Sequence, residues 1–149
     1  MENNIKLTTE EAMRLIGLLK YKIEKPTIQF PHLGEKLQFE ALSSSSSDKF
    51  TVNITRSTHN KAKCTYQGRT SNNIPIMRLD VGTNITHINS DGTKIIGNHL
   101  HIYDAETDML DATEFNTSSP DLYKNCIEFF KKFNLIVDEN DIIYQEELF

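Results

Sequence analysis

The chain has 149 residues, of which 38% are hydrophobic and 25% charged, so its size and composition fit a single domain over residues 1–149. Its opening residues lack the basic and apolar regions of a signal peptide, and no apolar run reaches the ~18 residues that cross a bilayer. We therefore expect a cytoplasmic protein without a membrane partner, and the net charge of −5 disfavours a general nucleic-acid-binding protein.

The first predicted element is a helix that begins at Thr8 and ends before Pro26. Thr8 and Glu11 have the spacing of a capping box, in which side chains and backbone amides satisfy one another. Apolar residues then recur at helical spacing as far as Ile23, and a proline cannot continue a helix.

The middle of the chain changes to an alternation of period two, which is typical of strands with one wet face. Extended segments are expected at residues 27–30, 37–41, 50–55, 62–69, 74–81, 84–88 and 94–103. Five consecutive serines predict a flexible loop over residues 43–48. Asp91 and Gly92 predict a tight turn that pairs 84–88 with 94–103.

A second helix is predicted to start at Ser119, with Pro120 and Asp121 in its first turn. Its apolar stripe is expected to enter the core and consists of Leu122, Cys126, Phe129, Phe130 and Phe133. The predicted fold class is α+β, with a curved antiparallel sheet of about five strands packed by an N-terminal and a C-terminal helix.

The charges are divided unevenly along the chain. No acidic residue occurs from Lys49 to Leu79, a window with a net charge of +6, so the other residues together carry −11. Between Asp104 and Tyr123 there are only acidic charges. Such a division predicts one basic and one acidic surface, unless the two runs pair with each other or are simply solvated.

The segment Asn98–Tyr103 is the most informative part of the sequence. Side chains two apart in a strand share a face, so His99, His101 and Tyr103 are expected together on a wet face, with Leu100 and Ile102 directed to the core. His87 lies twelve residues before His99, across the predicted turn, and strand pairing would bring it close to the other two imidazoles.

Two chemistries suit three neighbouring histidines. Imidazoles titrate near neutral pH and can exchange protons with a substrate, as RNA cleavage requires. Alternatively, a His-x-His strand with a third histidine is a familiar zinc arrangement. We rank metal second and expect no cofactor, because no first-shell carboxylate obviously completes the set, although Asp80 and Asp104 are candidates. A purely structural hydrogen-bonding role for the histidines is the third alternative.

Several motifs in this region resemble those of an uncharacterised domain family of small proteins from Gram-positive bacteria, their phages and mobile elements. The family pattern has R-L-D, then H-x-N-P-D-G, then P-H-L-H-I-Y, and it is matched by Met77–Val81, His87–Gly92 and His99–Tyr103. An upstream K-x-T-Y-Q-x-R is matched at residues 63–69, so the resemblance covers about residues 50–105. Ser90 and Asn98 stand where the family has proline. The resemblance brings no established activity, but its setting favours nucleic-acid processing, toxins and anti-defence proteins.

The resulting prediction is a metal-independent endoribonuclease that acts on RNA. Its catalytic residues would be His87, His99 and His101, supported by Asp80, Asn89 and Tyr103. Phosphates would be bound by residues of the basic window, namely Arg56, Lys61, Lys63, Arg69 and Arg78. The alternative is a non-enzymatic, anti-CRISPR-like inhibitor that binds a host nuclease through an acidic surface, formed by Asp104, Glu106, Asp108 and Asp111.

Overall fold

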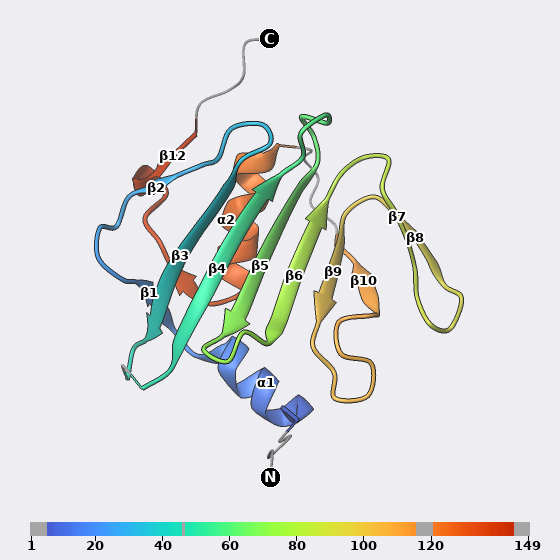
Figure 1. Ribbon diagram of the computed structural model, residues 1–149, viewed down its shortest axis with the longest axis horizontal. Coiled ribbons are helices and arrows are strands. Elements are labelled where there is room, and N and C mark those ends of the chain that lie inside the picture. The colour runs from blue at the N-terminus through green and yellow to red at the C-terminus, as the bar shows by residue number, and fades with distance from the viewer. Residues whose placement is uncertain (1–5, 46, 116–120, 145–149) are drawn as a thin grey trace.

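The computed structural model describes residues 6–45, 47–115 and 121–144 and has an α+β architecture. Its main sheet has eight strands, with both helices on one face and the other face open (Figure 1). The spatial order is β10 (Ala112–Glu114), β9 (His99–Ile102), β6 (Pro75–Val81), β5 (Cys64–Thr70), β4 (Lys49–Arg56), β3 (Lys36–Ser43), β1 (Lys20–Lys22) and β11 (Leu135–Ile136).

The predicted fold class is confirmed, but the expected number of about five strands is wrong. Sequence alternation identifies the five central strands, whereas the three additional strands are the short ones at the two edges. A run of two or three residues is too short to show a period. Within the main sheet, all neighbouring strands are antiparallel except β1 and β11, which pair in parallel. Two small sheets pair β2 (Ile28–Gln29) with β12 (Ile142–Ile143) and β7 (Thr86–Ile88) with β8 (Lys94–Ile96).

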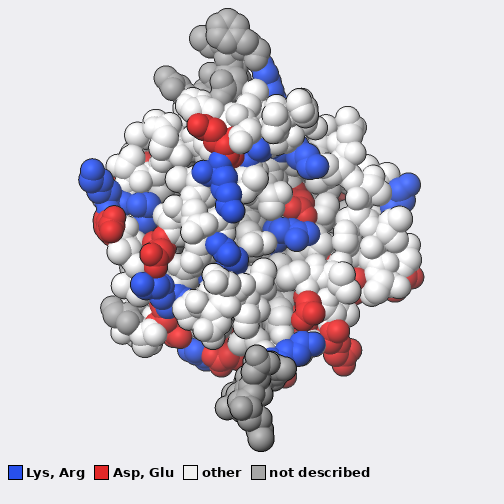
Figure 2. Space-filling model, viewed as in Figure 1, with Lys and Arg blue, Asp and Glu red and all other residues white. Residues whose placement is uncertain are grey.

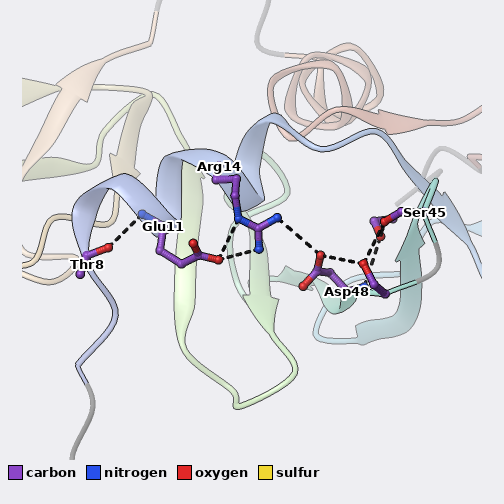
Figure 3. Close-up of polar contacts among 7 residues, drawn as sticks. Thr8, Glu11, Arg14, Ser45 and Asp48 are labelled. Atoms are coloured by element: carbon purple, nitrogen blue, oxygen red, sulfur yellow. Dashed lines mark hydrogen bonds and ion pairs between the residues drawn. The ribbon is translucent and has the colours of Figure 1, made fainter.

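Helix α1 (Thr9–Gly17) begins as predicted, although only half of the capping box forms. The Glu11 amide donates to Thr8 Oγ1 at 3.0 Å (Figure 3). The Glu11 carboxylate does not return to the backbone at Thr8 but pairs with Arg14, whose Nε and Nη2 lie 2.9 and 2.6 Å away. Arg14 also reaches Asp48, at 3.7 Å, and so connects the helix to the loop before β4.

The helix ends at Gly17, and the prediction that it continues to Pro26 is wrong. Residues 20–22 instead form β1, which pairs with β3 and β11. The buried amine of Lys20 explains much of this change, because it donates to the carbonyls of Ile16, Leu18 and Phe133 at 2.9, 2.8 and 2.6 Å. A lysine that satisfies the free carbonyls at a helix end closes the helix in place of a continued turn.

Helix α2 (Leu122–Lys132) covers the middle of the sheet, and its predicted apolar stripe is buried. Three of its phenylalanines pack against rings from the sheet: Phe130 against Phe39, Phe133 against Phe50, and Phe129 against Tyr66. The N-cap is Asp121, whose carboxylate accepts from the Tyr123 amide at 2.9 Å, and not Ser119 as predicted, two residues earlier. Ser119 and Pro120 lie outside the described residues.

The segment predicted as one strand over residues 94–103 is two strands, β8 and β9, which separate at Gly97. Gly97 has a φ of +94°, a conformation that side-chain-bearing residues rarely adopt. As a result β8 pairs only with β7, in a hairpin beside the main sheet, while β9 enters the sheet between β6 and β10 (Figure 1). The described part of the chain contains no helix with the length and apolar character needed to cross a membrane.

Candidate functional site

The side chains of His87, His99 and His101 meet on the open face of the sheet. The ring centroid of His87 lies 5.2 Å from that of His99 and 4.7 Å from that of His101, and the centroids of His99 and His101 are 5.1 Å apart. One nitrogen from each ring can be chosen so that all three lie within 4.8 Å of one another. The predicted meeting of the three imidazoles is therefore present in the structure.

The reason for this meeting differs from the expected one. His87 is opposite Ile95 in the hairpin and is not paired across a ladder with His99. His99 and His101 are instead opposite Asp80 and Arg78 of β6. The bend at Gly97 lets the β7–β8 hairpin place His87 against the histidines of β9.

The carboxylate of Asp80 is the polar centre of the cluster. Its Oδ2 lies 3.1 Å from His99 Nε2, 3.3 Å from His101 Nε2 and 3.2 Å from both Nε and Nη2 of Arg78. Its other oxygen accepts from Thr65 Oγ1 at 3.1 Å. Asp80 therefore fixes the orientation of two imidazoles, and neighbouring strands fix Asp80.

The proximity of these groups changes their pKa values. Burial alone would raise the pKa of Asp80, but hydrogen bonds from His101 and His99 and the charge of Arg78 outweigh it and hold this pKa well below its usual range. Burial likewise opposes the charged form of His99, yet the Asp80 carboxylate and the Gly97 carbonyl raise the pKa of that imidazole.

Two of the rings lie deeper than the sequence indicates. His99 is 5% exposed and His101 only 1%, so the expectation of a wet face is wrong. His99 Nδ1 is 2.9 Å from the Gly97 carbonyl and donates to it. Among the described residues, however, two buried ring nitrogens have no hydrogen-bond partner: His87 Nε2 and His101 Nδ1.

A pocket of about 320 Å³ opens beside the cluster. Its lining combines His87 and His99 with Asp80 and with Lys63, whose ammonium is exposed; Cys64, Thr65, Val81, Ile85 and Thr86 complete it. His101 is not part of the lining. The pocket thus gives access to two of the three histidines, while the third supports them from behind.

The predicted phosphate-binding residues are not all on this face. Lys63 lines the pocket, and Arg69 and Arg78 project from the same open face. Arg56 has the same parity in β4 as Phe50, Val52 and Ile54 and is 4% exposed. Its guanidinium donates to the carbonyls of Pro31 and Lys61, so it is buried on the core side of β4 and is not presented on the open face as the prediction requires. Lys61 is exposed but outside the pocket lining.

Two of the three predicted supporting residues serve the fold and not the cluster. The Asn89 side chain exchanges two 2.8 Å hydrogen bonds with the backbone of Ala112 and so attaches the hairpin to β10. Tyr103 follows the end of β9, is buried in the apolar core and donates its hydroxyl to the Leu7 carbonyl at 2.7 Å. Only Asp80 supports the histidines directly.

The four acidic residues proposed as a protein interface lie on the connection between β9 and β10. Asp111 accepts from the amide and the hydroxyl of Ser90, both at 2.8 Å, and thereby ties this connection to the hairpin. Asp104 accepts from the Glu106 amide at 2.8 Å and forms a backbone bridge to Asp108. Glu106 and Asp108 are exposed, the latter 3.6 Å from Lys6.

Sequence reasoning missed Thr65 and Gly97 as parts of the site. Thr65 has the same strand parity as Lys63 and is directly opposite Asp80, so a correct β5–β6 register would have indicated its contact. Gly97 contributes its carbonyl and its unusual φ, and nothing in the sequence shows that its oxygen faces an imidazole.

Comparison with protein families places most of the chain in one family. Residues 7–135 match a family of unknown function, DUF6978, and the chain belongs to that family. Among curated proteins and among solved structures, nothing matches the chain.

Proposed function

We propose that this protein cleaves RNA at the pocket beside the histidine cluster. The observation that carries the proposal is the composition of that pocket, where His87 and His99 lie beside an exposed lysine, Lys63. A phosphodiester held by the ammonium group would have the imidazoles next to its reacting atoms. Imidazoles move protons efficiently near neutral pH, and cations stabilise the negative charge that grows on a phosphate.

The open sheet face supports RNA as the substrate. Strands β4 and β5 contain no acidic residue, and the side chains on their open face are uncharged polar groups and cations, among them Arg69. Lys and Arg side chains lie across the middle of this face (Figure 2). A phosphate backbone gains affinity from such a surface by releasing its counterions, so a single strand could follow the sheet toward the pocket.

The reaction requires two proton transfers. The 2′-hydroxyl loses its proton and its oxygen attacks phosphorus, the bond from phosphorus to the 5′-oxygen breaks, and that oxygen receives a proton. The products are a 2′,3′-cyclic phosphate and a 5′-hydroxyl end. His87 and His99 can reach the substrate from the pocket lining, whereas His101 is a positioning residue that holds Asp80 and Arg78.

The test uses end-labelled single-stranded RNA and DNA of the same sequence. We expect the protein to cleave the RNA but not the DNA, which lacks the 2′-hydroxyl, and to leave cyclic phosphate ends. His87→Gln and His99→Gln should each lower the rate by about 100-fold or more. His59→Gln is the matched control, because His59 is exposed on a loop outside the pocket lining. RNA that stays intact with and without divalent ions would contradict the proposal.

A second candidate is a non-enzymatic inhibitor of a host nuclease. It is favoured by the exposure of Glu106 and Asp108 on one loop, where they could occupy a basic nucleic-acid groove. Reversing both charges to lysine should abolish a stable complex with such a nuclease, whereas the same change at the exposed Glu10 of α1 should not. Asp104 and Asp111 are poor test positions because their side chains hold the loop together.

A further inference from the structure

The two unpartnered nitrogens of the histidine cluster require an explanation. A buried polar atom without a partner loses its hydration without compensation, and such atoms are rare in native proteins. Here His87 Nε2 and His101 Nδ1 belong to neighbouring rings whose centroids are 4.7 Å apart. A shared partner would explain two unpartnered nitrogens on neighbouring rings, and a cation can bind the lone pair of one nitrogen from each ring at once.

The surroundings of the rings fit metal ligation. A histidine that binds a metal through one nitrogen usually donates the other N–H to a carbonyl or a carboxylate, which fixes its tautomer. His99 donates from Nδ1 to the Gly97 carbonyl, so its other nitrogen, Nε2, is the potential ligand. Nε2 also lies 3.1 Å from Asp80 Oδ2, and a bound cation would take the place of the proton in that contact. His101 Nε2 lies 3.3 Å from the Asp80 carboxylate, and that contact leaves Nδ1 as a potential ligand.

Arg78, next to Asp80, also bears on this assignment. Its Nη2 lies 3.0 Å from His101 Nε2 and can only donate. The same guanidinium lies 3.2 Å from Asp80 through both Nε and Nη2. If His101 Nδ1 binds the ion, the proton of this ring is on Nε2. Nε2–H then donates to Asp80, and the Arg78 guanidinium pairs with Asp80 and no longer with His101.

We propose that His87, His99 and His101 bind one divalent transition-metal ion of the zinc type, with an open coordination position toward the pocket. Three imidazoles without a thiolate suit zinc and its first-row neighbours, whereas magnesium and calcium prefer oxygen ligands. One nitrogen from each ring lies within 4.8 Å of the others, and a tetrahedral zinc ion with bonds of about 2.0–2.1 Å needs its ligands about 3.4 Å apart, so the rings must close in by roughly 1 Å on binding.

The open position connects this centre to the proposed function. His87 and His99 line the pocket, so a water molecule or a phosphate oxygen in the pocket could complete the coordination. When bound, such an ion would polarise the phosphoryl oxygen and stabilise the charge that develops there. Only this use of the ion rests on RNA cleavage; the binding of the ion itself does not.

The experiment measures metal binding directly, on the full chain with any purification tag removed. The protein is stripped with a chelator, titrated with Zn²⁺, and analysed for bound metal and for thermal stability. We expect one ion per chain and a rise in Tm, since a ligand that binds only the folded state stabilises it. Substitution with Co²⁺ should give the visible absorption bands of a low-coordinate nitrogen site.

The variants test two of the three proposed ligands. His87→Gln and His101→Gln should each weaken Zn²⁺ binding by at least about 100-fold, whereas His59→Gln should bind like the wild type. His87 is half-buried on the hairpin, so its variant is expected to fold, and circular dichroism checks both. Equal Zn²⁺ binding by wild type and His87→Gln, or no binding by the wild type, overturns the proposal.

The same samples separate the two proposals. A protein that binds one ion but leaves RNA intact keeps the metal centre and refutes RNA cleavage. A protein that binds no ion but cleaves RNA refutes the metal centre and keeps RNA cleavage, with the imidazoles as the proton-transfer groups. A protein that binds one ion but cleaves RNA equally well after chelation refutes the use of the ion in cleavage.

Discussion

The contact between Gly68 of β5 and the ring of Phe133 gives the sharpest test of the fold. A Cβ at position 68 would lie 2.4 Å from Phe133 Cζ and 2.7 and 2.8 Å from its Cε atoms, against a normal carbon–carbon contact of about 3.5–4.0 Å. The ring would have to move by about 1 Å, but Phe50 and Phe129 pack against it and the Lys20 amine lies 4.2 Å from its centroid. Gly68→Ala should therefore destabilise the protein.

The expected magnitude follows from the cost of overpacking. An inserted methyl group that forces side chains off their rotamers costs about 1–3 kcal/mol, and the lack of space around Phe133 places Gly68→Ala at the upper end, at about 3 kcal/mol. Phe133→Leu removes the atoms that clash and alone should cost about 1–2 kcal/mol. The loss of unfolding free energy in the double variant should be smaller than the summed losses of the two single variants by at least ~1 kcal/mol.

The assay is urea unfolding followed by circular dichroism, with the midpoint compared at constant m. Gly17→Ala is the matched control, because a Cβ at position 17 meets no atom within 4 Å at the end of α1. That variant should be neutral or more stable by up to ~1 kcal/mol. A cost below ~0.5 kcal/mol for Gly68→Ala, or additive energies in the double variant, would refute the packing described here.

Three further outcomes are expected. Lys20→Met should cost about 2–4 kcal/mol in urea unfolding, because three carbonyls lose their donor. Burial lowers the pKa of Lys20 from 10.5 to about 7, so between these pH values the unfolded chain binds a proton that the folded protein does not. The unfolding free energy of the wild type, relative to that of Lys20→Met, should therefore rise from pH 7 to pH 10. A difference that does not change with pH would contradict this. Gly97→Ala should cost about 1–3 kcal/mol by thermal or urea unfolding, since φ is +94° there, and an unchanged stability would show that the bend is not strained. Arg56→Gln should lower Tm but leave the RNA affinity of the folded protein unchanged, and a loss of affinity would restore Arg56 as a phosphate ligand.

The sequence predicts those elements whose residues repeat a period often enough to be recognised. Strands β3 to β6 and the apolar stripe of α2 are long enough for this, and they agree with the structure, whereas β9 is predicted only as the second half of a longer strand. The end of α1 is not predictable in the same way, because residues 18–23 continue a helical pattern while the chain turns into β1. What decides this segment is pairing with β3 and β11 and the contacts of the Lys20 amine, which are tertiary interactions.

The candidate site shows the same division. Alternation places His99 and His101 on one face, and their approach to His87 is correctly expected. The burial of His99 and His101 is not predicted from the sequence. It depends on the β7–β8 hairpin, which leaves the main sheet at Gly97 and packs over these two side chains. Charge patterning likewise selects the basic window but cannot tell that Arg56 points to the opposite side of β4 from the polar residues of the open face, although strand parity contains that information.

The position of α2 late in the chain has a consequence for biosynthesis. Strands β3 to β6 lie next to one another both in sequence and in the sheet, so they can pair while the ribosome is still translating the second half. Their apolar side then stays exposed to solvent until residues 122–136 emerge and supply both the covering helix and the strand beside β1. During that interval the nascent chain presents an aggregation-prone surface, and a chaperone that holds apolar segments would be most useful to it then.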